Sequence, residues 1–519
     1  FFKQKTAYEI STRDWSSDVC SSDLFYQIGS GQIVELSTGN YVAYWSFADL
    51  GVSGDQNYVQ DVGAVTYGSG TTGVQGEIST SNTFFTGTST NDSMGGQLIA
   101  LYGNGNFVLS QPYYDSASTQ DIGAVTWFSG ASAPTGIRNN TTNSITGSTT
   151  YDQVGKGLLA LENGNYIIFS SEWDNGSTAN VGAVTWASGS TSSNFSVAAA
   201  NSLIGSTAGD LVGSVLPPGY RYSNSKFVVG SPLWDNGATY NVGAVTVLDG
   251  SSSFSGTISS SNSLIGSSAG DLVGSGGFRS FSSTPAGSAF PNAINSFVVL
   301  SPAWANGSAT SAGAATWMSL SAPVTGVVSS SNSLVGSTTG DGSGLAMVLA
   351  NTWGIVLPSW DNGATTNAGA VTLMSATQGV IGTINSSNSV IGGISNSSPP
   401  ISVFVSPFNN KWIVTRRAEN KVTIPFSGTT AAQVRIEGRV LTAGGRGIPD
   451  ATITATDSAT GEVRNVRSNS FGKFIFTGLE AGGFYIITVA SSRRYQFEDG
   501  TRALQLTDDL TGIEFRARR

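Results

Sequence analysis

One short motif recurs six times along most of the chain. It reads VGAVT, IGAVT, VGAVT, VGAVT, AGAAT and AGAVT, and its leading glycines are Gly63, Gly123, Gly182, Gly243, Gly313 and Gly369. Neighbouring copies lie 56 to 70 residues apart. A period of this length is too long for a helical hairpin repeat and suits a unit of several strands, such as one propeller blade. The repetition therefore predicts the architecture, but it does not identify a binding partner.

The repeat unit is clearest between residues 154 and 214. Two apolar segments, LLAL and YIIFS, flank Asn163 and Gly164, a dipeptide that favours a tight hairpin because both central residues need a positive φ. The segments VGAVTW and NSLIGS predict a third and a fourth strand. Short strands joined by tight turns are typical of one antiparallel blade. The Gly-Ala pair of the third strand should allow neighbouring backbones to approach closely.

The repeats predict an all-β fold, with a β-propeller of six to seven four-stranded blades over residues 25–415. Residues 403–415 form a partial seventh unit that has a first hairpin but no GAVT strand. We expect upstream sequence to have supplied its missing strands, because a ring closed by both termini has no free sheet edges. A β-solenoid is the alternative, since two coils per unit could use the same period. The irregular spacing of the motifs argues against it.

The first 24 residues share nothing with the repeats. Residues 3–9 and 14–24 resemble, in the correct order, translated primer and adapter sequences from short-read DNA sequencing. We therefore expect residues 1–24, with the single cysteine Cys20, to be an artefact that plays no part in the fold. The native N-terminus would then be missing, so a signal peptide could not be seen in this sequence.

The composition limits the classes of function. Only 11% of residues are charged, against about 25% in ordinary soluble domains, and the net charge is −9. This acidity, without a basic stripe, argues against nucleic-acid binding, and no apolar run reaches the ~18 residues of a membrane span. Histidine is absent, which removes the commonest general base and the commonest metal ligand. We expect no enzyme activity, no metal and no cofactor.

The composition changes after residue 400, and charged residues become more frequent. Residues 416–433 are predicted to be a linker. Residues 434–519 contain alternating strands with the landmarks GRV at 438–440, GIPDA at 447–451, SFG at 470–472 and Phe474. This segment resembles the carboxypeptidase regulatory-like domain. The resemblance implies a small transthyretin-like β-sandwich that serves as an accessory module and has no peptidase chemistry.

The repeats themselves resemble two known families over about residues 28–394. Segments 227–250 and 263–275 are similar to the FG-GAP repeats of integrin-type propellers, and more similar still to repeats of bacterial haemagglutinin-like surface proteins. The calcium-binding loop of FG-GAP repeats has a DxDxDG-type run, because a hard cation needs several oxygen ligands. The corresponding hairpins here read ENGN, GNGN or STGN, so calcium is not expected.

The turns that follow the second strand are the most site-like feature. They contain Trp173, Asp174, Trp234, Asp235, Trp304, Trp360 and Asp361. Exposed tryptophans could stack on sugar rings while the acids accept hydroxyl hydrogen bonds. Alternatively, the tryptophans pack between units and the aspartates close turns. We favour packing, because repeated large aromatic residues usually belong to a core. Ala305 replaces the acid in one unit, and this fits a turn role of the aspartates, since a turn tolerates that loss better than a metal site would.

A second set of carboxylates lies where one unit passes to the next. Its members are Asp92, Asp152, Asp210, Asp271 and Asp341. They could form a ring of cation ligands, but we favour turn capping. Repeated units give repeated environments, whereas catalytic acids and bases need different ones.

Together these observations predict an exported bacterial surface protein, located outside the cell, that acts as an adhesin or binding scaffold. Its expected partners are surface glycans or other proteins. A carbohydrate-active propeller enzyme, either a lyase or a glycosidase, is one alternative, and it requires one unit with carboxylates that the others lack. A purely structural matrix protein is the other.

Overall fold

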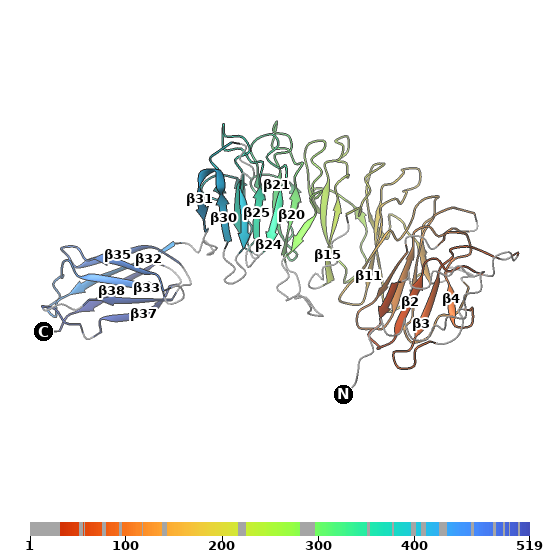
Figure 1. Ribbon diagram of the computed structural model, residues 1–519, viewed down its shortest axis with the longest axis horizontal. Helices are drawn as coiled ribbons and strands as arrows, with labels where there is room; N and C mark the ends of the chain where they lie inside the picture. Colours follow the sequence, from red (N-terminus) through yellow and green to blue (C-terminus); the bar gives the residue numbers. More distant parts are fainter. Residues whose placement is uncertain are drawn as a thin grey trace. The chain divides into compact units, whose positions relative to one another are not determined.

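The computed structural model describes residues 32–518 apart from 51–55, 57, 75–78, 93–95, 117, 138–142, 216–224, 281–295, 350–352, 376–377, 396–400, 406–411, 425–432, 458–460, 481–483, 491–493, 498 and 507–508. The predicted artefact, residues 1–24, lies outside this part. The chain divides into two compact units, Phe1–Pro425 and Phe426–Arg519, and each is described by itself. Both are built from β-strands (Figure 1), which confirms the all-β prediction.

Each repeat forms its own antiparallel sheet, and the strands follow one another in sequence order. The first three sheets contain β1 (Gln32–Glu35), β2 (Tyr41–Trp45), β3 (Ala64–Gly68) and β4 (Thr83–Phe85); β5 (Gln97–Ala100), β6 (Phe107–Gln111), β7 (Ala124–Phe128) and β9 (Ser144–Thr146); and β10 (Gly157–Ala160), β11 (Tyr166–Ser170), β12 (Ala183–Ala187) and β14 (Ser202–Ile204). The next three contain β15 (Lys226–Ser231), β16 (Ala244–Asp249) and β18 (Ser263–Ile265); β19 (Phe278–Ser280), β20 (Ser296–Ser301), β21 (Ala314–Ser319) and β23 (Leu334–Val335); and β24 (Ala346–Leu349), β25 (Trp353–Leu357), β26 (Ala370–Met374) and β28 (Val390–Ile391).

A very short strand from the next unit extends five of these sheets. We call these two-residue segments donor strands, and they are β8 (Gly136–Ile137), β13 (Phe195–Ser196), β17 (Gly256–Thr257), β22 (Gly326–Val327) and β27 (Gly382–Thr383). Each pairs in parallel with the last strand of the preceding unit. Consecutive units are therefore joined by backbone hydrogen bonds as well as by packing.

The cores lie between consecutive sheets. In the third sheet Phe169 pairs with Val184, and both pack in one cluster with Phe227 and Val245 of the fourth sheet. On the opposite face, Ile168 packs with Val125 of the second sheet. Both faces of a strand are thus apolar, which explains continuous runs such as YIIFS.

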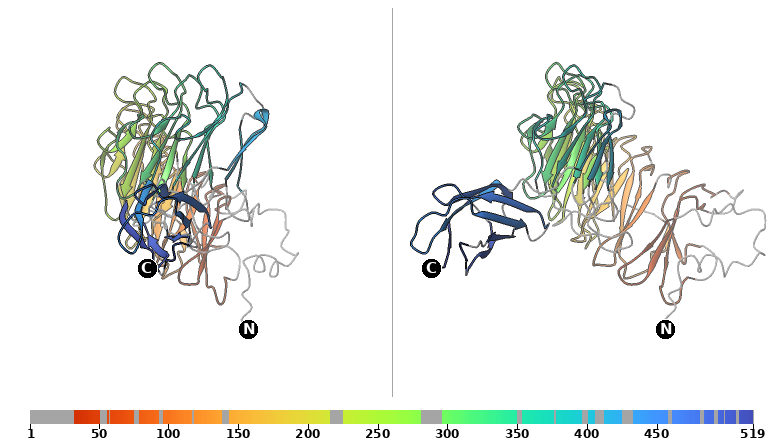
Figure 2. Two further views of the ribbon diagram at one scale, coloured as in Figure 1. Left: turned by 90° about the vertical axis from the view of Figure 1, so that its left-hand side faces the viewer. Right: turned by 60° about the vertical axis from the view of Figure 1, so that its left-hand side comes forward.

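The sheets of the repeat region follow one another in a row (Figures 1 and 2). The last sheet contains β29 (Ser402–Val405), β30 (Trp412–Arg416) and β31 (Lys421–Thr423). In the described part of the chain it does not pair with the first sheet. The sheets are not closed, so the predicted propeller is not confirmed. Donor strands link each unit only to the preceding one, and this nearest-neighbour connection is typical of a solenoid.

Part of the predicted linker has regular structure. Within residues 416–433, the 3-10 helix η2 (Arg417–Glu419) precedes β31, which pairs with β30. The first hairpin expected in the seventh unit is present, because β29 and β30 are antiparallel.

The second compact unit is a β-sandwich. One sheet contains β35 (Lys473–Glu480), β32 (Gln433–Leu441) and β38 (Leu510–Arg516), and the other β34 (Val463–Arg467), β33 (Thr452–Asp457), β36 (Phe484–Val489) and β37 (Thr501–Gln505). Its core includes Ile436, Phe474, Ile487 and Phe515. The sandwich predicted for the C-terminal segment is confirmed.

Candidate functional site

The tryptophans of the predicted site are buried between the sheets. Trp173 and Trp234 are each 3% exposed, and Trp304 and Trp360 are each 4% exposed. Within the described residues, their indole nitrogens have no hydrogen-bond partner. In this arrangement the rings pack as apolar groups inside the fold.

The aspartates of the same turns bind backbone of their own unit. The Oδ1 atom of Asp174 accepts the amide of Asn180 at 2.7 Å, and Asp235 and Asp361 accept Asn241 and Asn367 at the same distance. The three asparagines have positive φ values of 48° to 53°, a conformation in which most residues are strained. The carboxylates stabilise this left-handed residue just before the GAVT strand.

One unit shows that the turn forms without the acid. At Ala305 no carboxylate is available, yet the residue equivalent to the asparagines, Ser311, keeps a φ of 51°. The carboxylate therefore supports the turn but does not determine it.

The second set of aspartates joins neighbouring units. Asp92, Asp152, Asp210, Asp271 and Asp341 are at most 1% exposed. In the third unit the Oδ2 atom of Asp210 accepts the amides of Ser206 and Thr207 at 2.6 and 2.9 Å, and Oδ1 accepts the amide of Asp235 from the fourth unit at 3.0 Å. One carboxylate therefore caps a turn and also holds the next unit.

Carboxylates of neighbouring units come close to each other at two of these junctions. The hydroxyl of Thr338 lies 2.6 Å from Asp341 Oδ1 and 3.2 Å from Asp361 Oδ2. At the first junction, burial and then the neighbouring Asp115 carboxylate raise the pKa of Asp92, although three backbone amides oppose the shift. Among the described residues, no three such side chains form a group suited to a metal ion.

A second joint, which the sequence analysis missed, involves the hairpin asparagines. The carbonyl oxygen of Gly189 accepts Asn104 and Asn106 side chains at 2.8 Å and the Trp127 indole at 3.0 Å, all from the preceding unit. The carbonyl of Gly250 is bonded in the same way by Asn163, Asn165 and Trp186. In the sequence, the asparagines that recur on both sides of the hairpin glycine were the pattern that could have indicated this contact between units.

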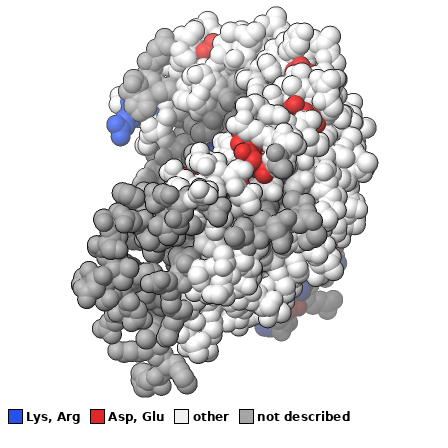
Figure 3. All heavy atoms as spheres, turned by 90° about the vertical axis from the view of Figure 1, so that its right-hand side faces the viewer, with Lys and Arg blue, Asp and Glu red and all other residues white. Residues whose placement is uncertain are grey.

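One recurring set of exposed polar groups lies in five turns that each precede the last strand of a unit. We call these the asparagine turns, at residues 79–82, 198–201, 259–262, 329–332 and 385–388. In each, the asparagine Oδ1 accepts the amide three residues earlier at 2.9 to 3.0 Å. The turns are therefore ordered, and they project serine hydroxyls such as those of Ser260 and Ser330. Figure 3 shows few charged side chains on one face of the molecule.

The comparisons with known proteins identify two sequence families. A repeat of unknown function, DUF5650, matches residues 35–96, 101–156, 160–214, 221–275, 293–345 and 352–398, which together are more than half of the chain. The carboxypeptidase regulatory-like domain matches residues 435–515. No curated protein sequence matches the chain.

The similar solved structures include pilus proteins, and the similarities are distant. The major pilin subunit of Bacillus cereus is 15% identical, with a TM-score of 0.14, over 20% of this chain and 36% of the pilin. A streptococcal ancillary pilin is 10% identical, with a TM-score of 0.16, over 29% and 50%. A C-terminal fragment of the pilus adhesin SpaC from Lactobacillus rhamnosus GG is 13% identical, with a TM-score of 0.16, over 40% and 74%. The chain thus spans half or less of the two pilins, and these TM-scores do not indicate a shared fold.

In the described part of the chain, no helix has the length and apolarity needed to cross a lipid bilayer.

Proposed function

Because the chain belongs to the family defined by the DUF5650 repeat, a repeat of unknown function, we propose that it is a rigid scaffold that binds or spaces other molecules at a bacterial cell surface. The observation that supports this most directly is the joint between units. At five successive junctions a buried aspartate accepts a backbone amide of the next unit.

These joints should make the row of sheets stiff. A hydrogen bond to a charged group contributes about 1.5–3 kcal/mol, and each buried carboxylate accepts at least three amides from two units. Relative movement of neighbouring sheets would break these bonds inside an apolar core. The scaffold therefore holds its exposed turns at fixed intervals.

The same joints support a function without catalysis. Acid and base catalysis needs carboxylates in different environments, whereas these five carboxylates make equivalent contacts with backbone amides in five units. In our proposal the tryptophans of the turns pack between neighbouring sheets. Stacking of a tryptophan on a sugar would require those two sheets to separate.

We also propose an open, solenoid-like row rather than a closed propeller, because the donor strands connect units in series. The similarity to FG-GAP and haemagglutinin-like repeats then concerns the four-stranded unit and not a ring. Location outside the cell fits a region that has no cysteine after Cys20, since it needs no oxidant to fold.

The asparagine turns are the proposed contact surface, and surface glycans or other proteins are the proposed partners. Their hydroxyl and amide groups can donate and accept hydrogen bonds. A row of turns that share the same asparagine hydrogen bond suits a partner with a repeating structure, because many weak contacts then act together.

A glycan array probed with the full chain tests this proposal. We expect binding that falls at least about tenfold when Ser260 and Ser330 are both changed to alanine, because a lost pair of hydrogen bonds is worth ~1.4 kcal/mol or more. Matched controls are Ser177→Ala and Ser252→Ala, which remove exposed serines outside these turns. Absence of any ligand, together with ordered self-assembly of the protein, would instead indicate a structural matrix role.

A further inference from the structure

The sixth sheet ends differently from the sheets before it. In the second to fifth sheets, the carbonyl of the last residue of the final strand accepts a backbone amide from the segment that follows the donor strand. These carbonyls belong to Thr146, Ile204, Ile265 and Val335, and the distances are 3.0 to 3.2 Å. Two residues further along the chain, the amides of Ser148, Ser206, Ser267 and Ser337 are bound by the buried aspartates at 2.6 to 2.8 Å.

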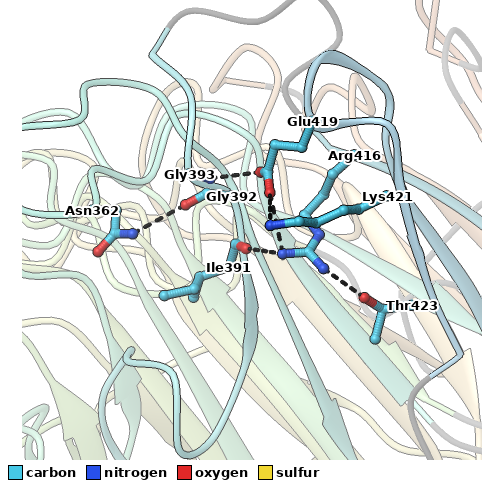
Figure 4. A network of polar contacts seen from close by, with 8 residues as sticks. All are labelled: Asn362, Ile391, Gly392, Gly393, Arg416, Glu419, Lys421 and Thr423. Carbon is cyan, nitrogen blue, oxygen red and sulfur yellow. Dashed lines mark hydrogen bonds and ion pairs between the residues drawn. The ribbon is translucent and has the colours of Figure 1, made fainter.

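In the sixth sheet, two side chains of the seventh unit bind the corresponding carbonyl and the corresponding amide. Arg416 Nη1 donates to the Ile391 carbonyl at 3.0 Å, where the other sheets have the donor-strand amide. Glu419 Oε1 accepts the Gly393 amide at 2.7 Å, where the other units use their own aspartate. Figure 4 shows both side chains turned toward the end of β28.

The seventh unit holds this pair in position. Arg416 Nη2 donates to Thr423 Oγ1 at 2.7 Å, and Glu419 Oε2 lies 3.5 Å from Arg416 Nη1 and 3.2 Å from Lys421 Nζ. The 3-10 helix η2 and the left-handed Asn420 (φ 55°) bring Glu419 and Lys421 back beside Arg416. The Arg416 and Glu419 side chains are only 18% and 9% exposed, whereas Lys421 is 61% exposed.

We propose that Arg416 and Glu419 form a side-chain cap that ends the series of donor-strand pairings and masks the edge of β28 against a donor strand from a second copy of this chain. The edge has the same backbone pattern as the four edges of the second to fifth sheets, each of which accepts a donor strand, and every copy carries such strands. An unpaired strand edge is a ready template for pairing with another molecule.

The charges make this cap sensitive to acid. Burial raises the pKa of Glu419, but the Gly393 amide, Lys421 and Arg416 together outweigh it, and the pKa lies below its ordinary value. Because the pKa is lowered in the folded state, the cap stabilises the fold above the ordinary pKa of 4.5, and this contribution is lost as the pH falls through the folded value. Self-association of the wild-type chain should therefore begin in acid.

Two variants of the full chain test the cap. Glu419→Gln removes the charge, and the double change Arg416→Ala with Glu419→Ala removes both contacts. The matched control is Glu514→Gln, which removes a carboxylate paired with Arg516 at 2.7 Å on the exposed surface of the other compact unit.

We expect exchange of the Gly393 amide hydrogen to become at least about tenfold faster in the double variant, because a hydrogen bond to a charged group is lost. Light scattering should show a concentration-dependent rise in mass at neutral pH, because the Ile391 carbonyl that Arg416 occupies in the wild type is then free to accept an amide from a donor strand. Glu419→Gln should behave in the same direction with a smaller effect, and the control should match the wild type. Unchanged exchange at Gly393, or faster exchange without a rise in mass, would overturn the proposal. Retained protection of β25 and β26 will show that the variants are folded.

Discussion

Two glycines of the third unit share a backbone conformation but differ in their surroundings. Gly176 has a φ of 63° and Gly182 a φ of 72°. An added Cβ on Gly176 would have no atom within 4 Å, whereas on Gly182 it would lie 2.3 Å from the Val212 nitrogen. Gly182 therefore serves both turn geometry and the close passage of the segment that leads to the next unit.

We expect Gly176→Ala to lower the free energy of unfolding by about 1 kcal/mol, the cost of placing alanine at positive φ. Gly182→Ala should cost at least about 3 kcal/mol, because the backbone of the next segment must also move. Urea unfolding of the two variants under identical conditions checks the difference. Equal losses would mean that the contact with Val212 is not tight.

The roles of individual turn residues could be predicted only in part from the sequence. Closing of turns by aspartate was expected, and Asp174 and Asp210 both bind turn amides. The sequence could not show that Asp210 also holds Asp235 of the next unit, because that contact depends on how two sheets face each other. Burial of Trp173 was favoured but not decided, since a tryptophan in a turn can point to either side.

Some strands could be predicted from the sequence, and others could not. The four strands of the third unit were predicted, because their apolar runs and the Asn163-Gly164 turn are long enough to recognise. The donor strands were missed. A segment such as Gly256–Thr257 has two residues, which is too short for any periodicity, and its partner Leu203–Ile204 is more than 50 residues away.

A proline in the segment after a donor strand tests its hydrogen bonding. The amide of Ile258 donates to the Ile204 carbonyl at 3.2 Å, and its side chain is 3% exposed. Ile258→Ala should cost about 2–5 kcal/mol through lost packing. Ile258→Pro should cost about 2 kcal/mol more, because it also removes the donor. Hydrogen exchange should show the extra loosening at β14 in the preceding unit. If proline and alanine are equally destabilising, the donor strand adds no stability.

For the repeat region as a whole, the sequence indicated the repeated unit but not whether the units form a closed ring or an open row. A period of about 60 residues fits both a ring and a row, because the same sheet can pack its faces around an axis or along one. The deciding contacts come from the donor strands, which the sequence does not reveal. The C-terminal sandwich was more predictable, because its alternating strands and landmark glycines match a known domain along its whole length.

A distance between the first and last sheets distinguishes the row from a ring. Stacked sheets lie about 10 Å apart, so six steps from Ser37 to Val422 should place spin labels on the order of 60 Å apart. In a ring these sites would belong to neighbouring blades, and the distance would be about 10–20 Å. Pulsed electron resonance on cysteine variants in a Cys20→Ser background measures this distance.

The matched control is a label pair at Ser37 and Glu162, which are two sheets apart in either architecture and should be separated by about 20 Å. Both residues are exposed in the hairpins of their units, so labelling should not disturb the core. A long first distance with a short control distance identifies the row, whereas two short distances would restore the propeller. The first result is also required if the Arg416–Glu419 cap ends the series of donor-strand pairings, because that series has an end in a row and none in a complete ring.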